Sequence, residues 1–315
     1  MRPYLFHTQQ APKDRGPSRK SNQCIRREFP MSRPVKITAD TSCDIGPLLK
    51  ERYDVELVPL HVTMNDQEYL DGVNITNDMI YENWEKTGSL PKTSAVSVGE
   101  YEDVFQKYVD QGCDVIHVSL GSGLSVTHQN ALMAAEDISG VYVIDSCSLS
   151  TGTGLLVCEA GERVKKGMDA PAIYEEVKAL NQKNSASFIL DTLDFLHAGG
   201  RCSSLAHMGA NLMSIKPSIR VLNEQNGNMT VGKKYFGKLK KGIVAYIHDQ
   251  LADRTDIVRD RIFITHSGFP AEDIEWMKAE VEKYGPWGEV LVTTAGCTIS
   301  SHCGPGCMGV LFLTK

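Results

Sequence analysis

Three segments of the chain carry hydroxyl residues, together with acidic residues or glycines, where a predicted strand gives way to a helix. They are residues 40–44 (DTSCD), 120–127 (LGSGLSVT) and 145–151 (DSCSLST). In an α/β sheet, ligands collect at such strand-to-helix loops. Ser125 stands at the predicted start of a helix, where its hydroxyl and the nearby N–H groups can face an anion or simply cap the helix. The pattern therefore predicts either an anion site or a plain helix cap.

Two familiar motifs come close to this loop, and neither fits it. Gly121 and Gly123 begin a dinucleotide-binding fingerprint, but Val126 occupies the place of the third glycine. Gly123 and Ser125 also resemble a nucleophile elbow, in which Thr127 replaces the closing glycine. A catalytic role for Ser125 stays open as an alternative, and it would require a histidine base from elsewhere in the chain.

A double glycine before Arg201 is a second candidate for binding an anion. Gly199 and Gly200 allow a tight backbone turn, which would aim the Arg201 guanidinium at a carboxylate or a phosphate. The same residues also fit the end of a helix that is followed by a solvated arginine. Both interpretations are open from the sequence.

His302 stands beside a tight Gly-Pro-Gly turn near the C-terminus, close to several cysteines. These are Cys297, Cys303 and Cys307. By type, the four side chains offer zinc ligands or redox-active thiols, but their spacing is not that of a CxxC metal site. Most of them would also fall on one short loop. Buried, inert thiols are the favoured interpretation, and we expect neither a metal nor a cofactor.

Strand-like and helix-like stretches alternate from Pro34 onward, which predicts a parallel sheet with crossover helices. The expected strands of this half are 35–39, 55–63, 114–119 and 141–144, with a hairpin at 65–70 and a loop at 89–94. A short helix is expected to end near residue 52, and four further helices are expected at 77–87, 125–138, 151–166 and 170–183. A capping box at Ser97 and Glu100 predicts the start of another helix.

The pattern changes near residue 185 and predicts a mixed sheet with helices on one face. Strands are expected at 187–190, 218–222, 229–231, 262–265, 289–293 and 308–313, with helices at 236–251 and 271–284. Asn226 and Gly227 predict a hairpin between two of these strands. We therefore expect a two-domain α/β fold, with a parallel-sheet domain at 34–175 and a mixed-sheet domain at 176–315.

The composition suits a folded protein. The chain has 315 residues, 42% of them hydrophobic, and its apolar runs have only strand length. Residues 1–33 hold eight Lys and Arg against two Asp and Glu, and we expect a disordered basic tail there. The remainder holds 25 Lys and Arg against 37 Asp and Glu, a balance that disfavours binding to nucleic acid. Nine scattered cysteines favour the cytoplasm, and a monomer is expected.

Taken together, the motifs resemble those of the DegV family, the fatty-acid-binding proteins of bacteria. The matching segments are ITADTSCD at 37–44, VPL at 58–60, YLDG at 69–72, KTS at 92–94, SGLSVT at 122–127, VIDS at 143–146, DTL at 191–193, GGR at 199–201, IKP at 215–217 and HCGPG at 302–306. Their order and spacing over residues 35–313 carry the resemblance, since no single motif is specific.

The resemblance implies that a long-chain fatty acid of about 14–18 carbons (C14–C18), such as palmitate, lies in an apolar tunnel. It implies that Thr93 and Ser125 hold the carboxylate and that Arg201 and His302 lie near this head group. Family members present the acid to a separate fatty-acid kinase and have no turnover of their own. The chain would then be a lipid carrier in fatty acid metabolism, with transient membrane contact and no membrane span.

Departures from the family pattern flank the proposed carboxylate site and leave the preferred acyl chain open. Ala95 and Val96 replace the usual Gln-Pro, and Val126 replaces a glycine. The chemistry of the ligand supports the carrier interpretation, because burying a chain of sixteen carbons contributes roughly 12 kcal/mol before the costs of binding. The alternative is a serine esterase or thioesterase with Ser125 as nucleophile and His302 as base.

Overall fold

The structure is a computed structural model that describes residues 33–204 and 215–315. The tail predicted for residues 1–33 lies outside this range except for Arg33, whose Nε donates to Gly112 O at 3.0 Å. Every described helix falls short of the length and apolarity that crossing a bilayer requires.

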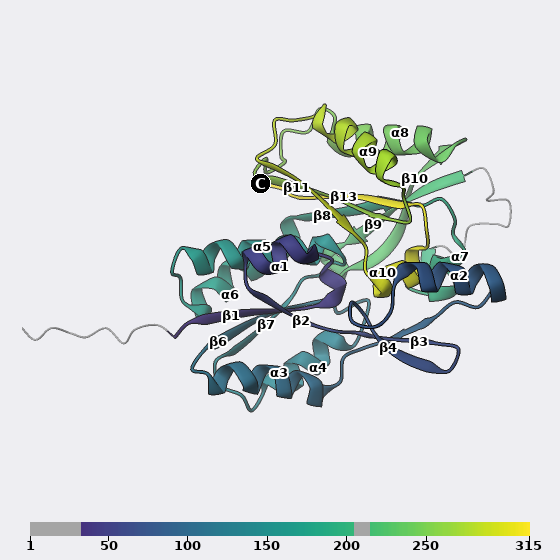
Figure 1. Cartoon of the computed structure of the whole chain (residues 1–315). Helices are drawn as coiled ribbons and strands as arrows, with labels where there is room; N and C mark the ends of the chain where they lie inside the picture. The colour runs from purple at the N-terminus through teal and green to yellow at the C-terminus, as the bar shows by residue number, and fades with distance from the viewer. Residues whose placement is uncertain (1–32, 205–214) are drawn as a thin grey trace, which may run out of the picture. The chain divides into compact units, whose positions relative to one another are not determined.

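A parallel sheet with strand order β2-β1-β6-β7 forms the first half of the fold. Its strands are β1 (Val35–Asp40), β2 (Val55–Val58), β6 (Asp114–Ser119) and β7 (Val141–Asp145). Helices cover both faces, as buried parallel strands require. One face carries α3 (Val98–Asp110) and α4 (Thr127–Ala135), and the other carries α1 (Gly46–Arg52), α5 (Thr151–Lys165) and α6 (Ala170–Lys178), as Figure 1 shows. The predicted parallel sheet with crossover helices is confirmed.

Local signals set the ends of these helices. The predicted capping box is present, since Ser97 Oγ accepts from the Glu100 N–H and the Glu100 carboxylate accepts from the Ser97 N–H at 2.8 Å. Two helices are shorter than predicted. The helix expected from Ser125 begins at Thr127, and the helix expected to reach residue 183 ends at Lys178, because residues 181–183 tighten into a 3-10 turn.

A small antiparallel sheet, β4-β3-β5, corrects the prediction in two places. Strands β3 (His61–Met64) and β4 (Gln67–Leu70) form the predicted hairpin, and α2 (Asn77–Thr87) follows it. The single strand predicted over 55–63 is wrong, because Pro59 lacks the N–H that would continue the ladder, and β3 enters a different sheet. The predicted loop at 89–94 is wrong at its end, where β5 (Lys92–Ser94) pairs with β3.

A mixed sheet with order β10-β9-β8-β13-β11-β12 forms the second half, as predicted. Its strands are β8 (Asn184–Ile189), β9 (Ile215–Leu222), β10 (Asn228–Phe236), β11 (Arg261–Ser267), β12 (Glu289–Thr294) and β13 (Cys307–Leu313). Helices α8 (Leu239–Leu251) and α9 (Ala271–Glu282) pack on one face, and α5 contacts the other. The predicted hairpin joins β9 to β10, with φ of 58° at Asn226 and 92° at Gly227. The domain boundary after residue 175 stays a prediction.

Two short helices were given no residue range from the sequence, although a helix ending at the double glycine was one of the two open interpretations. They are α7 (Asp194–Gly199) and α10 (Cys297–Cys303), of six and seven residues, which is too short for an amphipathic repeat to be recognised. The two helices contact each other, and α10 also contacts α2. They matter for function because Arg201 follows α7 directly and His302 lies on α10.

Candidate functional site

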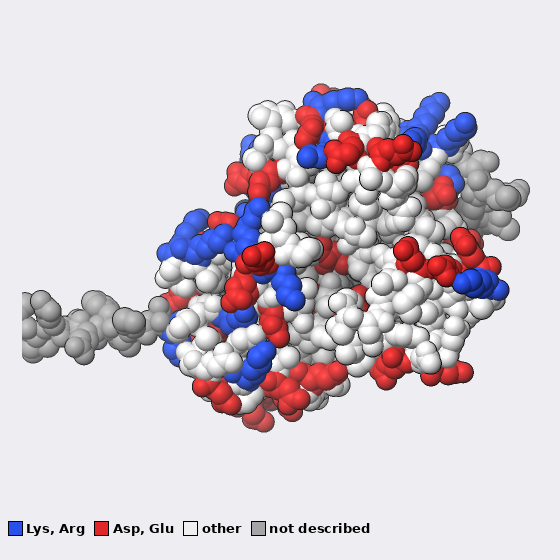
Figure 2. Space-filling view, viewed as in Figure 1, with Lys and Arg blue, Asp and Glu red and all other residues white. Residues whose placement is uncertain are grey.

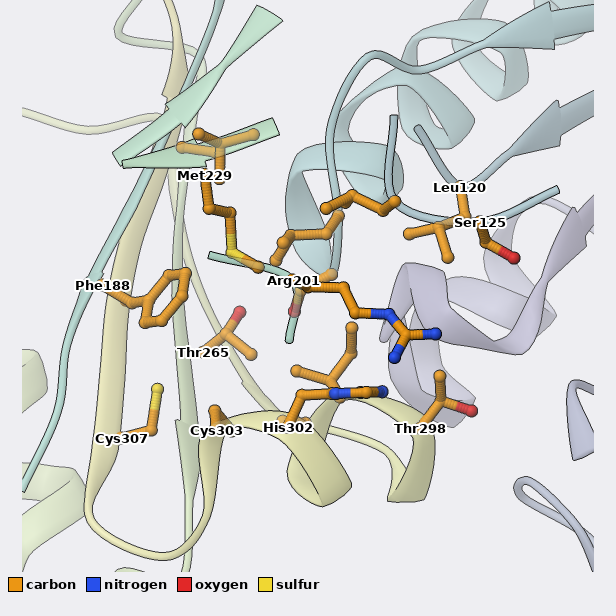
Figure 3. A pocket seen from close by; sticks show the side chains of 18 of the residues that line it. Leu120, Ser125, Phe188, Arg201, Met229, Thr265, Thr298, His302, Cys303 and Cys307 are labelled. Atoms are coloured by element: carbon orange, nitrogen blue, oxygen red, sulfur yellow. The ribbon is translucent and has the colours of Figure 1, made fainter. Parts of the chain in front are cut away.

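A largely apolar cavity of about 440 Å³ lies between the loops that follow the parallel strands and the inner face of the mixed sheet. This volume is in the range of small-molecule pockets. Its larger apolar lining residues are Leu60, Leu120, Leu124, Leu149, Phe188, Leu196, Val221, Met229, Ile299 and Leu311. In Figure 3, Ser125, Thr298 and the tip of Arg201 lie toward one end, while Phe188 and Met229 lie toward the other. The cavity therefore has a polar end and an apolar end.

All four head-group candidates from the sequence line this cavity: Thr93, Ser125, Arg201 and His302. They come from four separate segments of the chain. Thr93 Oγ1 and His302 Nε2 lie 2.8 Å apart and share a hydrogen bond, although 209 residues separate them. The structure thus brings the predicted residues to one place. Their roles toward a ligand stay a prediction.

Thr93 is held by strand pairing on one side and by α4 on the other. It lies opposite Val62 in the register of β5 with β3. Just beyond β5, Val96 is fully buried, and its carbonyl accepts a hydrogen bond from Asn130 Nδ2 on α4 at 2.7 Å. One of the two departures after KTS, Val96, therefore serves as an apolar anchor for the strand that presents Thr93.

The glycines before Ser125 serve close packing between loops. Gly121 N–H donates to Ser148 O at 2.8 Å, and Gly123 N–H donates to Asn226 O at 2.9 Å. A Cβ at Gly121 would lie 2.8 Å from Asn226 O, which is too close, and a Cβ at Gly123 would lie 3.0 Å from it, which would require the loop to shift. Ser125 Oγ accepts from the Thr127 N–H at 3.2 Å, so its own hydroxyl proton is left to donate elsewhere.

The helix-end interpretation of the double glycine is confirmed, and the binding of an anion by Arg201 stays a prediction. Gly200 ends α7 with φ of 67°, the left-handed conformation in which glycine is favoured. Gly199 has a different reason, because a Cβ there would overlap Nδ1 of the His302 ring. Arg201 is exposed, its Nη1 donates to Gly199 O at 2.6 Å, and its side chain lines the cavity. The motif thus packs His302 and aims the guanidinium together.

Two buried aspartic acid side chains fix the helix that carries His302. Asp71 accepts from the Cys297 N–H at 2.8 Å and from the Thr298 N–H at 3.2 Å. Asp44 accepts from the Gly296 N–H at 2.8 Å and from the Ser150 hydroxyl at 2.5 Å. Burial raises the pKa of Asp44 to about 8 despite these donors. These contacts satisfy the first N–H groups of α10 and set its position.

The imidazole of His302 is neutral near pH 7. Burial, and secondarily the charge of Arg201, lower its pKa to about 4. Nδ1 is buried against Gly199 and has no hydrogen-bond partner among the described residues. A proton on Nδ1 would be an unsatisfied buried donor, so the proton belongs on Nε2. His302 therefore donates to Thr93 Oγ1, which leaves the Thr93 hydroxyl proton available to a ligand.

The esterase alternative is not supported by this geometry. A serine nucleophile needs its base within hydrogen-bond reach. In the described part of the chain, His302 Nε2 is bonded to Thr93, and Ser125 Oγ is bonded to the Thr127 N–H, with no hydrogen bond between Ser125 and His302. The two residues face the same cavity without forming a catalytic pair.

Two of the cysteines near the C-terminus, Cys297 and Cys303, point to different neighbours. Cys297 donates to Ile75 O at 3.4 Å, whereas Cys303 Sγ lies 3.7 Å from Ser267 Oγ. Burial raises the pKa of the Cys297 thiol to about 12, so it is a thiol near pH 7. Within residues 33–204 and 215–315, no group of three or more His, Cys, Asp or Glu side chains is placed to hold a metal ion.

Comparison with known proteins agrees with this architecture. The model of the DegV family, described as a family of uncharacterised proteins, matches residues 34–315. The chain belongs to the DegV family. A DegV domain-containing protein of Clostridium perfringens is 29% identical over 286 residues, which cover 88% of this chain and 96% of that protein.

Solved structures of DegV proteins share the fold. A fatty-acid-binding DegV family protein from Thermus thermophilus has 26% identity and a TM-score of 0.80, covering 90% of this chain and 100% of that one. A stearic acid-binding protein from Eubacterium ventriosum has 25% identity and a TM-score of 0.74, covering 89% and 98%. The two-domain DegV fold expected from the sequence is therefore confirmed.

The sequence did not identify the residues that line the apolar end. Phe188 on β8, Val221 on β9 and Met229 on β10 belong to this group. Thr298, one helical turn before His302, was missed at the polar end. Alternation along β8 is a signal that points to Phe188, because residues two apart share a face of the sheet. No local signal marks the others as cavity residues.

Proposed function

We propose that this DegV protein binds a long-chain fatty acid in the cavity and presents it to a separate fatty-acid kinase. The observation that carries the proposal is the cavity itself, which is largely apolar and has hydroxyl and cationic groups at one end. DegV relatives named for fatty acid binding, including the Thermus and Eubacterium proteins, support the choice of ligand. In this proposal the chain acts as a cytoplasmic monomer.

The proposed head-group site uses neutral donors for most of its contacts. The Thr93 and Ser125 hydroxyls each have a proton to give, so both can donate to the same carboxylate. Because His302 donates to Thr93 Oγ1, it polarises that hydroxyl and orients its proton toward the ligand. Arg201 offsets the remaining charge from the solvent side. Such a site keeps the acid ionised while burying its first carbons.

The proposed tail site provides most of the affinity. Each buried methylene contributes about 0.8 kcal/mol, so a sixteen-carbon chain contributes roughly 12 kcal/mol, from which the costs of association are subtracted. Among the described residues, the apolar end is lined by Phe188, Val221, Met229 and Leu311, none of which carries a charge. A hydrocarbon tail fits this lining, whereas a polar extension would leave its groups unsatisfied.

The exposed surface near the head group suits presentation to an enzyme. Val126, beside Ser125, is 66% exposed and lines the cavity, and Arg201 is exposed as well. A kinase can therefore approach the carboxylate end while the tail stays buried. Transfer of a phosphoryl group to the carboxylate would be carried out by the kinase, with this chain holding the acid in place.

Thermal unfolding with matched ligands tests the binding part of the proposal. Palmitate is expected to raise the melting temperature more than hexadecanol does, because only palmitate carries the carboxylate for Thr93 and Ser125. Equal shifts would contradict the head-group assignment, and no shift with either ligand would contradict the tail site. The kinase part is tested by acyl phosphate formation from palmitate, which should depend on this protein and fall with Arg201→Ala.

A further inference from the structure

Three acidic side chains are buried among the residues that the structure describes: Asp40, Asp44 and Asp71. Other Asp and Glu side chains gather at the surface, as Figure 2 shows for one face of the molecule. A buried aspartic acid side chain is costly unless hydrogen bonds satisfy it, so each of the three requires an explanation. Asp44 and Asp71 accept from the first N–H groups of α10. Asp40, the last residue of β1, has a different set of partners.

The partners of Asp40 hold the two ends of the loop between β6 and α4, which carries Ser125. Asp40 Oδ2 accepts from the Leu120 N–H at 2.7 Å, where the loop begins. Asp40 Oδ1 accepts from the hydroxyl of Tyr101 on α3, and this hydroxyl also lies 2.7 Å from Thr127 Oγ1. Thr127 ends the loop and is the first residue of α4. One side chain therefore holds both ends of the loop, one directly and the other through Tyr101.

The proton count fixes the direction of these hydrogen bonds. Tyr101 has one hydroxyl proton and gives it to Asp40, so Thr127 must donate to the Tyr101 oxygen. Burial, and secondarily the charge of Asp40, raise the pKa of Tyr101 well above its ordinary value, so the phenol keeps this proton. The Thr127 N–H in turn donates to Ser125 Oγ at 3.2 Å. An unbroken series of hydrogen bonds thus links Asp40 to Ser125.

Aromatic packing fixes the position of Tyr101 within this series. Its ring stacks on Phe105 with centroids 5.5 Å apart and meets the His117 ring edge-on at 5.0 Å. His117 Nε2 lies 3.4 Å from Asp40 Oδ1, and its Nδ1 lies 2.9 Å from Thr38 Oγ1. All five side chains are fully buried. Neither Asp40 nor Tyr101 can therefore exchange its partners for bulk water.

The start of α4 depends on these contacts because it lacks an ordinary side-chain cap. Val126 occupies the N-cap position and provides no acceptor. The Thr127 hydroxyl is turned inward to Tyr101. The position of the first helical residue, and with it the N–H that contacts Ser125, is thus set by the buried partners of Thr127.

We propose that Asp40 and Tyr101 form a clamp that positions the Ser125 hydroxyl for the head group of the bound acid. Neither Asp40 nor Tyr101 is among the residues that line the cavity, so both act through the loop and are positioning residues. A hydroxyl that is held in place before binding loses less conformational freedom when it donates to a carboxylate. The inference rests on the proposed function, since it requires Ser125 to contact that carboxylate.

A double-mutant cycle with Ser125 tests the Asp40–Tyr101 clamp. Tyr101→Phe keeps the ring and removes the hydroxyl that links Asp40 to Thr127. We expect the dissociation constant for palmitate, from equilibrium titration, to rise about 5- to 10-fold in the wild-type background and less than about twofold in the Ser125→Ala background. Equal losses in both backgrounds would overturn the inference, because Tyr101 would then act independently of Ser125.

Substitutions at Thr127 test the same series of hydrogen bonds without changing Tyr101. Thr127→Val removes the hydroxyl at nearly constant volume and should weaken palmitate binding as Tyr101→Phe does. Thr127→Ser keeps the hydroxyl and should bind palmitate as the wild type does. This pair decides the question even where Tyr101→Phe does not fold. Equal losses of affinity in the two Thr127 variants would count against the clamp.

Tyr53→Phe is the matched control. The Tyr53 hydroxyl is also buried, donates to Glu162 Oε1 at 2.6 Å and accepts from Arg261 Nη1 at 3.2 Å. None of these three residues lines the cavity. Tyr53→Phe should therefore lower the melting temperature to an extent similar to Tyr101→Phe, with an unchanged dissociation constant for palmitate. An equal loss of affinity in both variants would reduce the effect of Tyr101 to general stability.

Hydrogen exchange of the protein without ligand separates this inference from the proposed function. The Leu120 and Thr127 amides both donate hydrogen bonds within the clamped loop. Tyr101→Phe should speed their exchange relative to the wild type, whereas Tyr53→Phe should not. Unchanged exchange in Tyr101→Phe would overturn the clamp even in a protein that binds palmitate well. A wild-type protein that binds no palmitate would contradict the proposed function, while faster exchange in Tyr101→Phe would still support the clamp.

Discussion

Thr93 on β5 and His302 on α10 share a hydrogen bond of 2.8 Å across a sequence separation of 209 residues. The bond joins the small antiparallel sheet to the helix that precedes the last strand of the mixed sheet. Because burial keeps His302 neutral, the bond has one donor, the imidazole, and the Thr93 hydroxyl remains free to donate. The Thr93 hydroxyl is thus one of the points at which the two halves of the fold contact each other.

Removing either hydroxyl should weaken fatty acid binding. Thr93→Val and Ser125→Ala each take away one hydrogen bond to a charged group, which contributes about 1.5–3 kcal/mol. We expect the dissociation constant for palmitate to rise about 10- to 100-fold in each variant, measured by equilibrium titration. Thr63→Val on β3 and Ser122→Ala in the same loop as Ser125 are the controls, since neither residue lines the cavity. Unchanged affinity in the Thr93/Ser125 double variant would remove these residues from the site.

The pH dependence of stability should carry the signature of His302. Its pKa in the folded protein is lowered to about 4, so between about pH 6.5 and 4 the unfolded chain binds a proton that the folded chain does not. The free energy of unfolding should therefore decrease as the pH falls through this range, by up to about 3 kcal/mol. His302→Gln should remove that part of the slope.

Asp44 contributes to the pH dependence of stability with the opposite sign, so its contribution must be measured separately from that of His302. Its pKa is raised to about 8, so the folded chain binds the extra proton and stability should increase as the pH falls from 8 toward the ordinary value of an aspartic acid. Urea unfolding of Asp44→Asn and His302→Gln over this range isolates each contribution. A wild-type slope that neither variant changes would contradict both assignments.

The two adjacent glycines should respond differently to alanine. In Gly199→Ala the new methyl would overlap the His302 ring, so we expect loss of stability and also weaker palmitate binding. In Gly200→Ala the methyl meets no atom within 4 Å, and only the positive φ of 67° is penalised, by about 1 kcal/mol. Melting temperatures and palmitate titrations of both variants make the comparison. Equal losses of affinity would argue against His302 as a positioning residue.

A larger side chain at Val221 should distinguish an empty cavity from a packed core. Val221 lines the cavity on β9 and is 7% exposed. Val221→Phe should fill part of the cavity, so we expect the melting temperature to hold or rise and long acyl chains to bind less tightly than shorter ones. If the interior were packed, the same change would cost about 1–3 kcal/mol of stability. Unfolding and a chain-length series of fatty acids read out the two effects.

Much of the fold was predictable because its elements have regular periods. Strands such as β6 are continuous runs of buried residues, and a capping box at Ser97 marks the start of α3. The elements that were not predicted correctly are short, or they form only through pairing with residues far away in the sequence. Strand β5 has three residues and exists through its pairing with β3, so nothing local in residues 92–94 marks it as a strand.

The sequence predicted four residues that line the cavity, but it did not predict their geometry. Thr93, Ser125, Arg201 and His302 were identified through motif resemblance, and they do converge on one cavity. Their convergence depends on long-range contacts, such as the hydrogen bond between Thr93 and His302. The packing of Gly199 against His302 is also invisible in sequence, where a double glycine indicates only a turn. Predicting the residues at the apolar end of the cavity would require knowing which faces of the strands pack against each other.

Native mass spectrometry of the protein as purified is the most direct test of the central claim. The account predicts a mass excess equal to one long-chain fatty acid, which solvent extraction removes and added palmitate restores. The excess should be lost in the Thr93/Ser125 double variant. A protein that carries no acyl species as purified, and takes up no palmitate afterwards, would contradict the account.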